Sequence, residues 1–202
     1  MSTTAPALIP IGRETLTVTE SLQLFARETS TLIDELSRKS PQDFAQVVQL
    51  LNAAENVFFL GAGRSGLALK MTAMRFMHLG LSVHVVGETT TPAISAGDVL
   101  FVAIGSGTTG AIVRSATTAL AVGARVIVLT TAPESPLGVM ATITVTIPAA
   151  QKLERGSLLS EQYAGGLFEQ ATMLLGDALF HTMWQQSGKT ADDIWPLHAN
   201  LE

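Results

Sequence analysis

With 202 residues, of which 47% are hydrophobic and only 14% charged, the chain is sized for one α/β domain, and we expect sister subunits to cover part of its surface. Its formal net charge of −5 argues against nucleic acid and acidic membranes as partners, and no apolar run reaches the roughly 18 residues of a membrane span. The lack of cysteine excludes disulfides and thiol chemistry and, with no signal-peptide pattern at the start, favours a cytoplasmic protein.

Two helices are predicted before the first strand. Apolar residues recur at helical spacing over residues 16–38, and Ser40-Pro41 ends that segment and starts a second helix over residues 42–54. The first helix has an apolar stripe, so we expect it to pack on the domain or on a neighbouring subunit. We divide the chain into an N-terminal helical extension, residues 1–30, and one domain, residues 31–202.

Five short apolar runs rich in β-branched residues are typical of buried parallel strands. They span residues 57–60, 81–86, 99–104, 124–129 and 141–147, with helical patterns between them at 67–79, 109–122 and 136–140. This alternation predicts a five-stranded parallel sheet with helices on both faces, a flavodoxin-like three-layer sandwich. Ligands of such sheets bind beyond the carboxyl ends of the strands, where two glycine-rich turns are expected.

The first of these turns follows the first predicted strand and reads Gly61-Ala62-Gly63-Arg64-Ser65-Gly66. Glycine permits positive φ and a close approach of the backbone to a ligand, and the following helix points free N–H groups at the same place. An anion is therefore the expected ligand of this turn, and Arg64 is a candidate to pair with it. The alternative is a tight turn that needs glycine only for close packing of strand and helix.

The second turn follows the third predicted strand and reads Gly105-Ser106-Gly107-Thr108-Thr109-Gly110. Its three hydroxyl groups can donate hydrogen bonds to phosphate oxygens, and the next helix supplies backbone N–H groups. Each hydroxyl alone is more often an ordinary helix cap. Three hydroxyls beside Gly105 and Gly107, facing another glycine-rich turn, favour a phosphate pocket.

A dinucleotide site is an alternative interpretation of the first turn. Gly61, Gly63 and Gly66 have the spacing of the dinucleotide fingerprint, and Glu88 lies about where an acid would reach a ribose hydroxyl. The Tyr-x-x-x-Lys pair of a short-chain reductase is absent, because Tyr163 is the only tyrosine and a leucine stands four residues later. The hydroxyl-rich second turn would also crowd the path of the dinucleotide.

Together these segments resemble the SIS (sugar isomerase) domain family, which binds phosphosugars. The two turns are moderately specific, and the more decisive segments are Gly87-Glu88-Thr89-Thr90-Thr91-Pro92-Ala93-Ile94, Gly165-Gly166-Leu167-Phe168-Glu169-Gln170 and His198-Ala199-Asn200-Leu201-Glu202. The likeness runs from about Leu32 to the last residue. It implies interconversion of D-arabino-hex-3-ulose 6-phosphate and fructose 6-phosphate through an enediol, in the ribulose monophosphate route of formaldehyde fixation. It also implies no metal or organic cofactor and a homotetramer with sites near subunit interfaces.

Moving a carbonyl by one carbon requires a base that carries a proton between neighbouring carbons. Glu169 is the candidate, in the first turn of a long predicted helix, although the residues alone fit a glutamate that caps this turn equally well. The resemblance favours the base. His198 is the second candidate, because imidazole exchanges protons near neutral pH, and the resemblance implies that it reaches a neighbouring subunit's site. From the residues alone, a histidine so near the end would belong to a frayed tail.

The expected site thus has two catalytic and eight substrate-binding residues and no metal. The catalytic residues are Glu169 and His198, and the substrate-binding residues are Gly63, Arg64, Ser65, Thr91, Ser106, Gly107, Thr108 and Thr109. One alternative is a SIS aldose–ketose isomerase that acts on arabinose 5-phosphate or a heptose phosphate. Another is a non-catalytic phosphosugar-binding regulator, but the basic helix-turn-helix segment of such proteins is not evident before residue 40.

Overall fold

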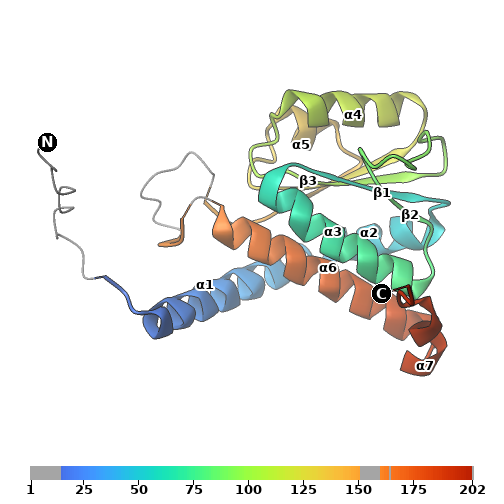
Figure 1. Cartoon of the computed structure of the whole chain (residues 1–202). Coiled ribbons are helices and arrows are strands. Elements are labelled where there is room, and N and C mark those ends of the chain that lie inside the picture. Colours follow the sequence, from blue (N-terminus) through green and yellow to red (C-terminus); the bar gives the residue numbers. More distant parts are fainter. Residues whose placement is uncertain (1–14, 151–159, 164, 202) are drawn as a thin grey trace, which may run out of the picture.

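Two helices precede the sheet in the computed structural model, which describes residues 15–150, 160–163 and 165–201 (Figure 1). Helix α1 (Val18–Lys39) begins with a capping box, in which the Thr17 N–H donates to the Glu20 carboxylate at 2.8 Å. Helix α2 (Pro41–Ala53) begins with a proline. Both predicted helices are therefore present. The predicted domain boundary after residue 30 falls inside α1 and stays a prediction, and residues 1–14 of the extension lie outside the described residues.

The five predicted strands form one parallel sheet, which confirms the predicted fold class. The strands are β1 (Val57–Gly61), β2 (Val83–Val85), β3 (Val99–Ala103), β4 (Arg125–Thr130) and β5 (Ile143–Thr146), in the order β2-β1-β3-β4-β5. The strand order reverses beside β1, so β1 and β3 flank the point where ligands bind in such sheets. The register pairs Gly61 with Ala103, so the two glycine-rich turns leave the sheet side by side.

Helices cover both faces of this sheet, as Figure 1 shows. One face carries α2, α3 (Gly63–Leu79) and α6 (Gly166–Ser187), and the other carries α4 (Gly110–Ala121) and α5 (Pro136–Met140). Adjacent strand residues alternate between the two cores, with Phe59 on the side of α3 and α6 and Phe58 on the side of α4. Helix α1 packs on α6 of its own chain, which is one of the two arrangements expected from the apolar stripe of α1.

Helices α3 and α6 pack closely and begin at the same end of the molecule (Figure 1). The close approach depends on Gly176 of α6, because a Cβ atom there would collide with the buried side chain of Thr72 of α3. This packing brings the first turn of α6 next to the turn between β1 and α3. The fold thereby joins two segments that are far apart in the sequence.

The carboxyl-terminal segment forms two short helices, α7 (Ala191–Ile194) and the 3-10 helix η1 (Trp195–Leu197). They lie near the carboxyl-terminal ends of α3 and α6, where the Lys189 ammonium donates a hydrogen bond to the Leu79 carbonyl at 3.2 Å. In the part of the chain that the structure describes, no helix combines the length and the apolar character needed to cross a membrane.

Candidate active site

The glycines in the turn between β1 and α3 have two different structural roles, close packing and a positive φ. A Cβ atom on Gly66 would lie 2.6 Å from the Gly61 carbonyl oxygen, so these two glycines let the helix touch the strand. Gly63 instead has a φ of +58° and open space around it. For Gly61 and Gly66, glycine is thus explained by the close packing of strand and helix, which is the alternative to ligand binding given by the sequence analysis. Gly63, Arg64 and Ser65 form the first turn of α3, whose N-cap residue Ala62 provides no side-chain cap.

The turn between β3 and α4 exposes its hydroxyl groups. Gly107, with a φ of +63°, leaves room for the Ser135 side chain beneath the turn. The Thr108 hydroxyl donates to the Ser106 hydroxyl oxygen at 3.2 Å. Thr109 occupies the N-cap position of α4 without a side-chain capping bond, so its hydroxyl is not used as the ordinary cap that the sequence allows. These groups lie where the N–H groups of α4 also point.

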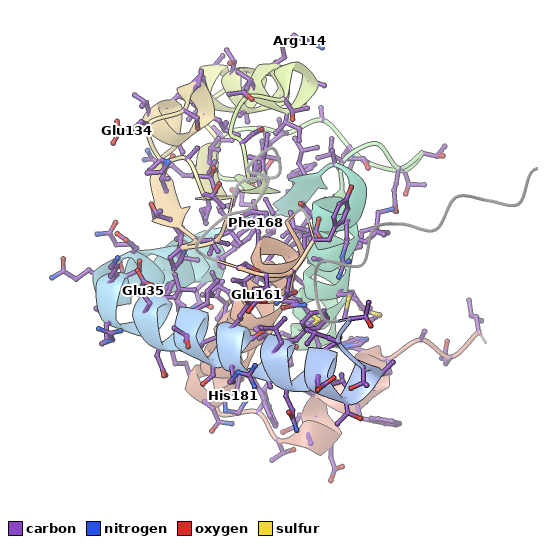
Figure 2. All side chains as sticks on the ribbon, turned by 90° about the vertical axis from the view of Figure 1, so that its left-hand side faces the viewer. Glu35, Arg114, Glu134, Glu161, Phe168 and His181 are labelled. Atoms are coloured by element: carbon purple, nitrogen blue, oxygen red, sulfur yellow. The ribbon has the colours of Figure 1, made fainter. Side chains whose placement is uncertain are left out.

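Glu169 connects the first turn of α6 to the turn after β1. Its side chain is 14% exposed, and its Oε2 atom lies 2.7 Å from Nε of Arg64, whose side chain is 67% exposed. The neighbouring residue Phe168 approaches the other turn, because its ring lies 4.0 Å from where a Cβ atom on Gly105 would be. Figure 2 shows Phe168 at the beginning of α6, on the side of the sheet. The first turn of α6 therefore lies beside both glycine-rich turns, with the Glu169 carboxylate against the first turn and the Phe168 ring near the second.

The Thr91 side chain has a different environment. Its hydroxyl donates to the Val85 carbonyl at 2.6 Å, and the residue borders a cavity of about 210 Å³ that Phe58 and Ser115 also line. That cavity lies on the α4 side of the sheet, whereas the Arg64–Glu169 pair lies on the α6 side. The substrate-binding role of Thr91 stays a prediction.

Glu88, the acid that the dinucleotide interpretation requires, is paired within the chain. Its carboxylate lies 3.0 Å from the ammonium group of Lys70 on α3, and both side chains are about half exposed. The third glycine of the fingerprint, Gly66, is packed against the backbone of Gly61. These contacts give the glycine spacing and Glu88 a structural explanation that needs no dinucleotide.

His198 lies at the opposite end of α3 from Glu169. Its ring stacks on His78 with centroids 3.8 Å apart and also contacts Trp195 at 4.7 Å. The 17 residues of α3 span about 25 Å, with Arg64 in the first turn and His78 in the last. The structure thus brings Glu169, but not His198, to the turn between β1 and α3 of the same chain. A role for His198 in another subunit's site stays a prediction.

The buried His78 ring is expected to make the stability of the fold sensitive to acid. Burial lowers the pKa of His78, and the charges of His198 and Arg75 lower it further. As the pH falls through about 6.5, the unfolded chain binds the proton before the folded chain does, so the stabilising contribution is complete above this pH and is lost below it. We expect the free energy of unfolding to fall more steeply in the wild type than in His78→Phe between about pH 7.5 and about pH 5.5.

Urea unfolding at several pH values measures this difference. The phenylalanine ring keeps the stacking on His198 but cannot take up a proton, so the two proteins share every other titrating group. If the free energy of unfolding depended equally on pH in the two proteins, His78 would not contribute to the loss of stability in acid.

One polar cluster beside the first turn of α6 was missed by the sequence analysis. Gln170, which follows Glu169, contacts Gln162 and Thr29, and Gln162 contacts Glu28. The segment 165–170 drew attention as a motif, but its partners on α1 lie more than 130 positions away. No local pattern connects residues at such separation, so only the folded chain reveals the cluster.

These features define a class of protein: an α/β domain with two glycine-rich turns, two helix N-termini and an acid side chain at the carboxyl edge of its sheet. Hydroxyl groups and two helix N-termini can hold an anion, and the Glu169 carboxylate can accept a proton. Within the described ranges, no three His, Asp or Glu side chains come together in a way that could hold a metal ion.

Comparison with known proteins names the family. Residues 50–181 match the model of the SIS domain, and the chain belongs to the SIS domain family, as the sequence resemblance predicts. It is 49% identical to the 3-hexulose-6-phosphate isomerase of Mycobacterium gastri over 92% of both chains. It is 35% identical to the enzyme of the same name from Bacillus subtilis (strain 168), over 81% of this chain and 89% of that one.

A solved structure agrees with the fold. A Methanococcus jannaschii protein, for which a 3-hexulose-6-phosphate isomerase function was inferred, superposes with a TM-score of 0.78 at 24% identity. The match covers 91% of this chain and 99% of that protein. At this identity the likeness establishes the fold alone, and it supports the single SIS domain architecture.

Proposed function

We propose that this chain is an isomerase that interconverts D-arabino-hex-3-ulose 6-phosphate and fructose 6-phosphate. The observation that carries the proposal is the Glu169 carboxylate, which lies against Arg64 of one glycine-rich turn, while the neighbouring residue Phe168 approaches the other turn. The high identity to relatives named 3-hexulose-6-phosphate isomerase supports this choice over arabinose 5-phosphate or heptose phosphate as substrate.

The reaction moves one proton between carbons and one between oxygens. Glu169 would remove the proton from C2 of the 3-ketose, leaving a 2,3-enediol, and return it to C3 to give the 2-ketose. The proton on O2 moves to O3 in the same interconversion, with His198 of a neighbouring subunit as the proposed carrier. The substrate is neither oxidised nor reduced overall, so this mechanism requires no redox cofactor.

The phosphate would be held at the two turns. The hydroxyls of Ser65, Ser106, Thr108 and Thr109 would donate to its oxygens, along with the N–H groups at the starts of α3 and α4. Gly63, with open space around it, would allow the backbone of the first turn to approach the ligand, and the positive φ of Gly107 would shape the second turn around it. Arg64 would contact the sugar from its exposed position beside Glu169.

An oligomer belongs to this proposal. Helix α3 exposes an apolar stripe of Leu67, Met71 and Met74, which begins one turn after Arg64. A sister subunit on this stripe would lie close to the site, as a homotetramer with sites near its interfaces requires. We further propose that the enzyme is cytoplasmic and serves the ribulose monophosphate route of formaldehyde fixation.

A coupled assay tests the function directly. Purified protein is given D-arabino-hex-3-ulose 6-phosphate, and the fructose 6-phosphate produced is measured through a coupling enzyme. Arabinose 5-phosphate and a heptose phosphate serve as alternative substrates in the same experiment. Preferred turnover of the 3-ketose supports the proposal, whereas preferred turnover of an aldose, or binding without turnover, contradicts it.

Removing two hydroxyls of the second turn is expected to weaken substrate binding. In Ser106→Ala/Thr109→Ala, KM should rise about tenfold or more with little change in kcat, because hydrogen bonds to a charged phosphate act in ground state and transition state alike. The control is Ser115→Ala, whose hydroxyl donates to the Ala111 carbonyl within α4. An unchanged KM in the double variant would contradict the phosphate role of this turn.

A further inference from the structure

Glu28 of α1 is the centre of a hydrogen-bonded cluster at the junction of α1 and α6. Its carboxylate accepts from the Ser160 hydroxyl at 2.7 Å, from the Glu161 backbone N–H at 2.7 Å and from the Gln162 side-chain amide at 3.0 Å. Figure 2 shows Glu161 beside the middle of α1. Hydrogen bonds to an ionised carboxylate are stronger than those between neutral groups. Glu28 therefore holds the segment 160–163 against α1.

The cluster continues into the first turn of α6. The Gln170 side-chain amide donates to the Gln162 amide oxygen at 2.9 Å, and the Thr29 hydroxyl donates to the Gln170 amide oxygen at 3.1 Å. Gly166 makes room for this arrangement, since a Cβ atom there would lie 3.1 Å from the Gln162 amide oxygen. The bonds thus connect Glu28 to the residue that follows Glu169.

The start of α6 has no side-chain cap among the described residues, so the polar cluster supplies the hydrogen-bonded contacts of this turn to α1. Its N-cap residue is Gly165, in a left-handed conformation with a φ of +83°, and no side chain of the described residues caps the helix there. On its other side, the Glu169 carboxylate meets the largely exposed Arg64 side chain. Leu167 and Phe168 anchor the apolar side of this turn in the core, and the polar cluster attaches its other side to α1.

We propose that Glu28 is a positioning residue for Glu169, which fixes the first turn of α6 through Gln162 and Gln170. This inference rests on the proposed function of Glu169 as the base. A proton transfer between carbons is sensitive to the placement of the base, and a misplacement of about 1 Å can lower the rate about a hundredfold. Helix α1 is on this view part of the active site, although it lies outside the glycine-rich turns.

The test compares Glu28→Ala and Glu28→Gln with the wild type, using D-arabino-hex-3-ulose 6-phosphate as substrate. In Glu28→Ala, kcat should fall about 10- to 100-fold while KM changes less than about twofold, since the phosphate contacts remain. The kcat of Glu28→Gln should lie between those of the wild type and Glu28→Ala, because the glutamine amide oxygen still accepts a hydrogen bond. The matched control is Glu35→Ala, which removes a carboxylate from the same helix two turns away (Figure 2).

Hydrogen exchange gives a second readout that needs no substrate. The backbone amides of residues 169–172 should exchange about tenfold faster in Glu28→Ala than in the wild type, while those in the middle of α4 do not change. If Glu28→Ala does not fold, the same kinetic and exchange measurements on Glu28→Gln test whether Glu28 positions the first turn of α6. A merely structural role of Glu28 would lower the free energy of unfolding without separating kcat from KM.

The outcomes separate this inference from the proposed function. If the wild type turns over the 3-ketose and kcat of the Glu28 variants matches that of Glu35→Ala, the positioning role is overturned. If the wild type turns over no phosphosugar, the proposed function fails, and the exchange rates alone decide whether Glu28 orders the first turn of α6. Unchanged exchange at residues 169–172 overturns the inference in either case.

Discussion

Replacing Glu169 by glutamine is expected to lower kcat about a thousandfold while phosphosugar binding remains. The amide has nearly the shape of the carboxylate but cannot accept the carbon-bound proton, and a general base of this kind contributes roughly 10²- to 10⁴-fold to a rate. Loss of the ion pair with Arg64 should cost little stability, because the Arg64 side chain is 67% exposed. The measurements are kcat from the coupled assay and the Kd for fructose 6-phosphate from calorimetry.

The control for this experiment is Glu88→Gln. Glu88 is also an acid paired with a basic side chain of α3, but its partner is Lys70 and both groups are about half exposed. This variant should retain wild-type turnover. Turnover of Glu169→Gln within about tenfold of the wild type would mean that another group is the base.

Replacing Gly66 by alanine is expected to cause a large loss of stability and to disturb the site. The new Cβ atom would lie 2.6 Å from the Gly61 carbonyl oxygen and 2.9 Å from its carbonyl carbon. These are backbone atoms that cannot rotate away, so α3 must move from β1 and carry Arg64 and Ser65 with it. We expect the free energy of unfolding to fall by about 3 kcal/mol, at the upper end of ordinary overpacking.

The comparison variant is Gly63→Ala, in the same turn. Gly63 has open space around it, so the only cost is the left-handed φ of +58°, about 1 kcal/mol for a residue with a Cβ atom. Urea unfolding of both variants measures the difference. A smaller loss in Gly66→Ala than in Gly63→Ala would show that the strand and helix can separate without cost.

The local sequence pattern was sufficient to predict the layers of the fold. The continuous apolar runs around Phe59, Phe101 and Ile127 indicate strands buried on both faces, and each lies in the observed sheet. The shortest strand, β2 (Val83–Val85), is narrower than the predicted run of residues 81–86, because pairing with β1 covers only three of its positions. Strand pairing depends on residues that are distant in the sequence, so the sequence pattern predicts that a strand is present better than it predicts where the strand ends.

In the candidate site, too, local sequence predicts the individual residues but not how they come together. Gly63, Ser106 and Glu169 were recognisable from the sequence because each lies in a short segment of unusual composition. Their closeness was not, since it depends on the register of β1 with β3 and on the packing of Gly176 against Thr72. The place of His198 beside His78, away from Glu169, likewise follows from how the carboxyl-terminal segment packs on α3.

The amino-acid sequence by itself thus determined the α/β class, the parallel sheet, the two glycine-rich turns and the family, because strand burial, turn chemistry and motif spacing are all local. Only the tertiary structure decided that Arg64 pairs with Glu169 and that Glu28 holds the segment before α6. The physical reason is that these contacts join segments that only the packing of helices on the sheet brings together.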